Sequence, residues 1–162
     1  MGQAREIMDR ITDAAMSGDR DALGRLYATD AVAETPDGPR LEGVAAITDY
    51  MLAFKAAFPD ASWEAGTKYE SGDTAIDEGY LVGTNTGVLT TPDGEIPPTG
   101  RSLRLRECDM VTVADGVASS HRFYFDQLDL MTQLGLVGAD TSAGAVPQPR
   151  AGTDRPSEAH VR

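Results

Sequence analysis

The chain has 162 residues, of which 41% are hydrophobic and 25% charged, and its formal net charge is −12. This length suits one domain with a substantial core, and the negative charge argues against nucleic acids and anionic membrane surfaces as partners, because both bind basic patches. The single cysteine, Cys108, excludes an internal disulfide or a multi-cysteine metal site and favours a reducing, cytoplasmic compartment.

Three stretches have the apolar spacing of helices. Residues 3–18 place apolar side chains three and four positions apart and end at a Ser-Gly pair. Residues 21–27 predict a second short helix, which Asp19 or Asp21 could cap. Residues 43–58 predict the clearest helix, which ends at a proline and carries an apolar stripe that we expect to face the core. The stripe consists of Val44, Ile47, Met51, Phe54 and Phe58, with Tyr50 at its border.

Several short segments have the alternation or the turn residues of a β-sheet. Residues 30–35 predict a short strand before a Pro-Asp-Gly-Pro turn. Residues 62–70 predict a half-buried antiparallel strand, and residues 74–84 a second one. Residues 85–100 are rich in Thr, Pro and Gly and predict a loop, placed at the mouth of a cavity. Residues 127–134 predict a last short helix.

The stretch from residue 101 to residue 136 carries the candidate site. Asp115-Gly116 separates two extended runs, which is a strong hairpin signal because glycine tolerates the positive φ of such turns. Because side chains alternate across a strand, Asp109 shares a face with apolar residues of the first arm, and His121 with those of the second. These faces hold Leu103, Leu105, Glu107, Val111 and Val113 beside Asp109, and Val117, Ser119, Phe123 and Phe125 beside His121.

An acid and an imidazole on apolar faces predict a lined pocket. Two alternatives stay open at this point. Asp109 could belong to a hydrogen-bonded structural network, or a β-bulge in the long first arm could reverse the alternation.

The order of elements indicates an α+β fold, in which helices cover one face of a curved antiparallel sheet that forms a cone around the long helix. Residues 1–137 make up this domain. Residues 138–162 are rich in Ala, Gly, Pro and Ser and lack aromatic residues, so we predict a disordered tail. No segment approaches the roughly 18 consecutive apolar residues that a membrane-spanning helix needs.

Three stretches resemble the SnoaL-like polyketide cyclase family of the nuclear transport factor 2-like superfamily. They read LYATDAVAETPDG, LEGVAAITDYMLAFKAAFPD and TGRSLRLRECDMVTVADGVASSHRFYFDQLDLMTQLGL. The last of them, with its closing D-Q-…-Q-L-G-L pattern, is the most specific. The resemblance extends over residues 3–137.

This resemblance implies a homodimer of cone-shaped barrels that hold a hydrophobic small molecule and need no cofactor or metal. In such cyclases an aspartate two residues after a histidine on the last strand is the general acid/base of an aldol closure, and here Phe123 follows His121 at that spacing. Related ketosteroid isomerases use an aspartate before a proline as base, where this chain has Thr35, and a second acid that matches Asp109. Relatives of limonene-epoxide hydrolase need an Asp–Arg–Asp arrangement, in which Asp109 could be one acid.

Two functions from different classes follow. The first is a cofactor-independent acid/base cyclase or isomerase acting on a hydrophobic, polyketide-like carbonyl compound, with Asp109 and His121 as catalytic residues. The residues expected to bind its substrate are Tyr27, Thr35, Tyr50, Phe54 and Phe123. The second is a non-catalytic small-molecule-binding or interaction module of the same fold. The sequence contains no glycine-rich phosphate motif and no nucleophile elbow, and its two histidines and one cysteine do not predict a zinc site.

Overall fold

The structure is a computed structural model and describes residues 2–92 and 94–137, so the predicted tail lies outside the described residues. In chain order the elements are α1 (Gln3–Ser17), α2 (Arg20–Leu26), β1 (Tyr27–Glu34), β2 (Leu41–Glu42), α3 (Val44–Ala57), β3 (Ser62–Ser71), β4 (Thr74–Thr84), β5 (Leu89–Thr91), β6 (Gly94–Ile96), β7 (Ser102–Ala114), β8 (Val117–Phe125) and α4 (Gln127–Gln133). None of the helices in this part of the chain is long and apolar enough to cross a bilayer.

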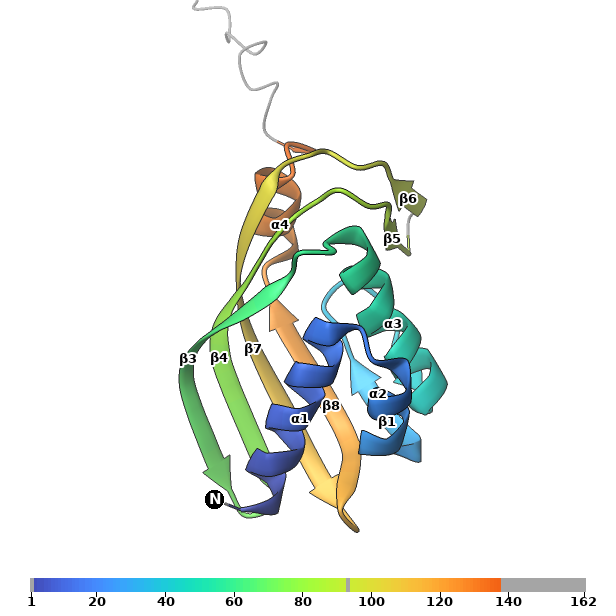
Figure 1. Cartoon of the computed structure of the whole chain (residues 1–162), viewed down its shortest axis with the longest axis vertical. Helices are drawn as coiled ribbons and strands as arrows, with labels where there is room; N and C mark the ends of the chain where they lie inside the picture. The colour runs from blue at the N-terminus through green and yellow to red at the C-terminus, as the bar shows by residue number, and fades with distance from the viewer. Residues whose placement is uncertain (1, 93, 138–162) are drawn as a thin grey trace, which may run out of the picture.

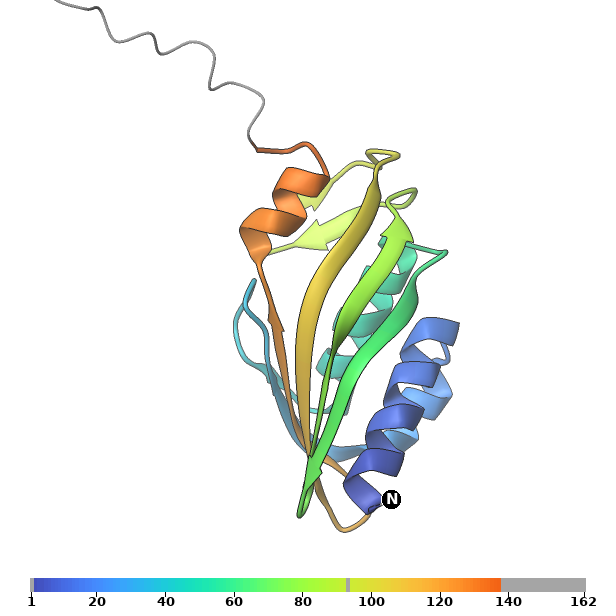
Figure 2. The same ribbon diagram turned by 90° about the vertical axis from the view of Figure 1, so that its left-hand side faces the viewer.

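The predicted α+β cone is confirmed. Six strands form one curved sheet in the order β2-β1-β8-β7-β4-β3, and all neighbours are antiparallel except β1 and β8, which run parallel. Helices α1, α2 and α3 lie on the same face of this sheet (Figure 1). The strands converge at the end near the N-terminus and spread at the other end, where α4 and the β5–β6 hairpin lie (Figure 2).

The helix boundaries follow from local chemistry. Helix α1 ends at Gly18, whose φ of 73° is in the left-handed region that glycine tolerates. The Asp19 side chain caps α2 by accepting from the Ala22 N–H at 2.9 Å, and the Asp126 side chain caps α4 in the same way. The predicted second helix was displaced by one residue, because α2 begins at Arg20 and Tyr27 already belongs to β1.

Two β-bulges change which side chains face the interior. Between Ala65 and Thr67 the register of β3 shifts at Gly66, and most of this edge strand is exposed, so the prediction of a half-buried strand was wrong. Between Thr112 and Val113 the register with β8 also shifts. As a result Ala118, and not the predicted Val117 and Ser119, shares the inner face with His121.

The segment 85–100 is not a plain loop. It contains the β5–β6 hairpin, and Leu89 packs into a core cluster with Phe58, Leu103 and Leu134. Asn85 is fully buried and accepts hydrogen bonds from the backbone and hydroxyl of Thr99, both at 2.9 Å. The segment therefore closes the wide end of the fold around its own core, and none of its described residues lines the cavity reported below.

Candidate functional site

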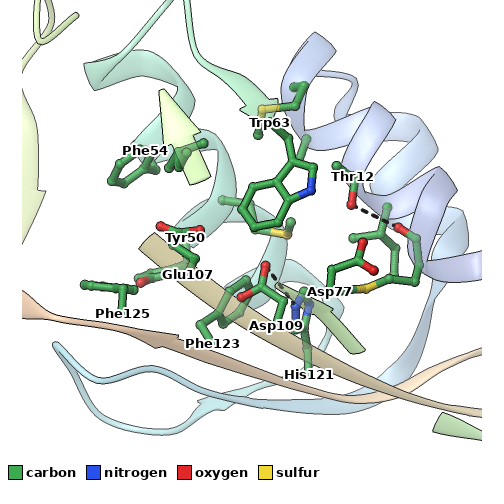
Figure 3. Close-up of a pocket in the computed structure, with 16 residues that line it drawn as sticks. Thr12, Tyr50, Phe54, Trp63, Asp77, Glu107, Asp109, His121, Phe123 and Phe125 are labelled. Carbon is green, nitrogen blue, oxygen red and sulfur yellow. Dashed lines mark hydrogen bonds and ion pairs between the residues drawn. The ribbon is translucent and has the colours of Figure 1, made fainter. Parts of the chain in front are cut away.

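A cavity lies between α1, α3 and the concave face of the sheet. Its volume is about 80 Å³, which is room for several water molecules. Its wall combines apolar and aromatic side chains with three carboxyl groups and one imidazole. The lining residues are Met8, Ile11, Thr12, Ala15, Met16, Tyr50, Met51, Phe54, Trp63, Asp77, Leu81, Glu107, Asp109, His121, Phe123 and Phe125 (Figure 3).

Asp109 is placed in this cavity by β7. The register of β7 against β4 is unbroken from Ser102 to Thr112, so no bulge reverses the predicted alternation at Asp109. Its side chain is 18% exposed, and its Oδ1 is buried without a hydrogen-bond partner. Burial, and next the negative charge of Asp77, raise the pKa of Asp109 from 3.8 to about 8. This carboxyl group therefore carries its proton at neutral pH, with a pKa near enough to neutrality that it can also release it.

His121 is held from behind by Tyr27. The Tyr27 hydroxyl and His121 Nδ1 are 2.6 Å apart, and both residues are buried. Burial lowers the pKa of His121 from 6.5 to about 3, and burial raises the pKa of Tyr27, with the charge of Asp109 as the second cause. Both groups are therefore neutral across the physiological range. Because the other acceptor within reach of the tyrosine is the weak thioether sulfur of Met51 at 3.6 Å, we assign Tyr27 as the donor to Nδ1, which leaves the proton of the imidazole on Nε2.

The expected pair of Asp109 and His121 is assembled, but not as a direct hydrogen bond. His121 Nε2 and Asp109 Oδ2 are 4.0 Å apart, beyond the range of a hydrogen bond, and Nε2 has no partner (Figure 3). A small movement of the Asp109 side chain or a bridging water would connect the two groups. The imidazole also stacks on Phe123, with ring centroids 3.8 Å apart.

Glu107 is a second carboxyl group in the cavity, and the sequence interpretation did not assign it a role. It shares the inner face of β7 with Asp109, two residues away. Burial, and next the charge of Asp109, raise its pKa well above the usual 4.5. Among the described residues its carboxyl group takes part in no ion pair or side-chain hydrogen bond.

Asp77 is the third carboxyl group, and unlike the other two it has a cationic partner. It lies on β4 directly opposite Asp109, is 1% exposed and accepts two hydrogen bonds from Arg5 of α1, at 2.5 and 2.9 Å. Such bidentate, buried Arg–carboxylate contacts are the strong form of ion pair. Arg5 also contacts Asp9 at 3.0 Å, so its bonds go to Asp77 and Asp9 and not to Asp109.

The aromatic part of the wall is only half buried. Tyr50, Phe54, Trp63, Phe123 and Phe125 all keep partial exposure, as expected for rings that border an open cavity rather than a filled core. Tyr50 and Phe123 are tilted against each other with centroids 5.5 Å apart. The expectation that the stripe of α3 is wholly core was therefore too simple, because Met51 and Phe54 line the cavity.

Two of the predicted binding residues do not line the cavity. Tyr27 reaches it only through His121. Thr35 lies just beyond the end of β1, outside the cavity, and its buried hydroxyl has no partner there, so its position does not support the role expected for it. Among the described residues no group of three or more His, Cys, Asp or Glu side chains is arranged to hold a metal ion.

Comparison with known proteins identifies the family to which this domain belongs. The model of the SnoaL-like domain matches residues 8–121, which is most of the chain. The chain belongs to the SnoaL-like domain family. No curated protein sequence gives a significant match.

Solved structures similar to this SnoaL-like domain share its fold. A proposed SnoaL-like polyketide cyclase from Jannaschia sp. CCS1 has a TM-score of 0.73 at 20% identity, over 84% of this chain and 94% of that one. IdmH, a proposed polyketide cyclase from Streptomyces antibioticus, has a TM-score of 0.68 at 24% identity, over 83% and 99%. An epoxide hydrolase of the LEH-like type from M. tuberculosis has a TM-score of 0.63 at 17% identity, over 82% and 89%.

Proposed function

We propose that this SnoaL-like domain is a cofactor-independent acid/base enzyme, a cyclase or isomerase that acts on a hydrophobic carbonyl compound. The observation that carries the proposal is Asp109, a carboxyl group in an aromatic-lined cavity whose pKa of about 8 lies close to neutrality. A general acid or base is most effective when its pKa is near the working pH. The similarity to proposed polyketide cyclases supports the same class of reaction.

Asp109 has two possible tasks, one for each protonation state. In its protonated form it donates a hydrogen bond to a carbonyl oxygen and stabilises the negative charge that develops there when an enolate forms. In its ionised form it removes a proton from the carbon next to that carbonyl. Both tasks use the 18% of the side chain that remains exposed in the cavity.

His121 acts in this proposal as a neutral hydrogen-bond donor. A proton relay through the ring would need the imidazolium form, which burial disfavours strongly. With Tyr27 bonded to Nδ1, the Nε2 proton faces Asp109 and orients or stabilises its ionised carboxylate once the 4.0 Å gap has closed. The half-buried aromatic rings supply an apolar surface for the body of the substrate.

An assay that needs no known substrate tests the proposal. In D₂O, the domain should accelerate exchange of the α-protons of neutral aromatic β-keto esters, which NMR detects directly. Asp109→Asn should reduce this rate about 10²–10⁴-fold while the fold is retained. Leu128→Ala, which truncates an exposed side chain of α4, serves as the matched surface control.

The same assay separates the enzyme from a binding module. The 4.0 Å gap and the phenylalanine at the position of the family acid are the observations that favour a binder. If esters quench the fluorescence of Trp63, the single tryptophan, yet no member of the panel exchanges faster with wild type than with Asp109→Asn, the cavity binds without catalysis.

We also propose a homodimer that forms through the outer face of the sheet. Tyr69 and Tyr124 are 56% and 50% exposed, and β7 adds Cys108 and Met110 to the side opposite the helices. The same face carries the ion-paired Arg106, and tyrosine and arginine are enriched at protein interfaces. Light scattering should give twice the monomer mass of 17.2 kDa, and Tyr124→Glu should reduce it to the monomer value.

A further inference from the structure

The Arg5–Asp77 pair lies beside the proposed acid/base but has no task in the proposed reaction. Asp77 and Asp109 are direct cross-strand partners on β4 and β7, and both side chains line the cavity. Cross-strand neighbours of an antiparallel pair have Cα atoms about 4.5–5.5 Å apart, so the two carboxyl groups lie in the same local environment. The site described so far would not need a charge at this position.

The position of Arg5 is itself fixed by the sheet. Glu70, at the end of β3, accepts hydrogen bonds from the backbone N–H groups of Gly2 and Arg5, both at 2.9 Å, and so holds the first turn of α1 against the sheet edge. Lys68 of the same strand binds Asp9 at 2.6 Å. The contacts of Glu70 and Lys68 therefore hold the first two turns of α1 on the sheet, and this places the guanidinium group of Arg5 next to Asp77.

The other charged or titratable groups around Asp109 do not supply a fixed charge. His121 on β8 is neutral near pH 7, as is Tyr50 on α3, whose pKa burial and the nearby Asp37 raise. Burial also raises the pKa of Glu107 on β7, which disfavours its charged form. Tyr27 contacts the site only through the imidazole. Asp9 of α1 is engaged by both Arg5 and Lys68.

We propose that Asp77, held by its two hydrogen bonds from Arg5, is a positioning residue that fixes a negative charge beside Asp109 and thereby keeps the proton on Asp109 in the free protein. This inference rests on the proposed function, in which Asp109 is the acid/base. Arg5 has two effects that differ in sign. It holds the Asp77 carboxyl group in place, but its own positive charge opposes the effect of Asp77, and Asp77 prevails because it is the immediate neighbour of Asp109.

NMR titration of the full chain, labelled with ¹³C at the aspartate carboxyl groups, tests this without a substrate. Asp109→Asn identifies the Asp109 signal. Asp77→Asn removes the negative charge and leaves the positive charge of Arg5, so the Asp109 midpoint should fall by about one pH unit or more. The double variant R5M/D77N removes both charges and should give a smaller fall, and Arg5→Lys, which keeps the charge, should stay near wild type.

The order of the Asp109 titration midpoints in these variants decides whether Asp77 keeps the proton on Asp109. A purely structural pair would change the melting temperature of the variants but leave the Asp109 midpoint unmoved, and that result overturns the inference. Should D77N not fold because Arg5 is left without its partner, the double variant provides the same comparison. If Asp109 of the wild type already titrates near 4, the proposed function fails. If the wild-type midpoint is near 8 but neither D77N nor R5M/D77N lowers it, only the role of Asp77 fails.

Discussion

Replacing Asp109 by Asn should stabilise the protein increasingly as the pH rises. The pKa of Asp109 is raised in the folded state, from 3.8 to about 8, so the folded protein holds this proton more tightly than the unfolded chain does. The stability that the protonated group contributes is complete below pH 3.8 and is lost as the pH rises toward 8. Asparagine has no proton to lose, so Asp109→Asn should not show this loss.

The size of the effect follows from the shift. Each pH unit between about 4 and 8 changes the free energy of unfolding by about 1.4 kcal/mol for one such group. At pH 7 the accumulated difference between Asp109→Asn and wild type is as much as about 4 kcal/mol, an upper value because the amide remains a polar group in the same cavity. At pH 4 the two proteins should be nearly equal in stability.

Urea denaturation between pH 4 and pH 8 measures this difference directly. Asp30→Asn, at an exposed position, is the control. It reports how much the loss of one carboxylate alone changes the free energy of unfolding of a chain of net charge −12. If the difference between Asp109→Asn and wild type does not change between pH 4 and pH 8, Asp109 is ionised in the folded state. A flat difference would refute both the buried acid and the mechanism built on it.

Other parts of the site give predictions of their own. Tyr27→Phe should lower the free energy of unfolding by about 1–3 kcal/mol in urea, because His121 Nδ1 loses its partner in a buried site. His121→Gln should gain stability relative to wild type as the pH falls from 6.5 toward 3, since the folded wild type resists protonation of the ring; a difference independent of pH would show that the imidazole is solvated. Asp126→Ala should cost about 1 kcal/mol through the lost cap of α4, read from the urea midpoint, and an unchanged midpoint would contradict the capping role.

The sequence predicted the orientation of Asp109 and His121 on β7 and β8 better than it predicted the residues around them. The alternation of β7 placed Asp109 correctly because that strand is paired without a break through this region. On β8 the bulge near Ser119 reversed the alternation of the first residues but came before His121, which therefore still faces inward with Phe123. A bulge is set by how two strands meet, and a single strand's pattern does not contain it.

Asp77 was missed because β4 is more apolar on its outer face than on its inner one. Ile76, Tyr80 and Val82 lie on the outer side, whereas the inner side has Gly79 and Gly83 beside Asp77. The glycines leave room for close neighbours. A Cβ at Gly79 would lie 2.7 Å from Cζ2 of Trp63, and one at Gly83 would lie 3.3 Å from Cβ of Phe58. A strand face made of glycines and an aspartate has the sequence pattern of a solvent-exposed face, although here it is covered by other side chains. The burial of Asp77 becomes evident only from its tertiary contact with Arg5.

The contrast between the three interior acids is the strongest argument that the cavity has a task. The chain supplies Asp77 with a bidentate arginine, yet in the described part of the chain it supplies no cation for Glu107 or Asp109 on the neighbouring strand. Two carboxyl groups in the cavity without a counter-charge lower the stability of the fold as the pH rises, and apolar residues of similar size would remove that cost. Retaining acids that weaken the fold is understandable when their protons are used on a ligand, as the proposed reaction requires, and aromatic rings lie around them in the same cavity.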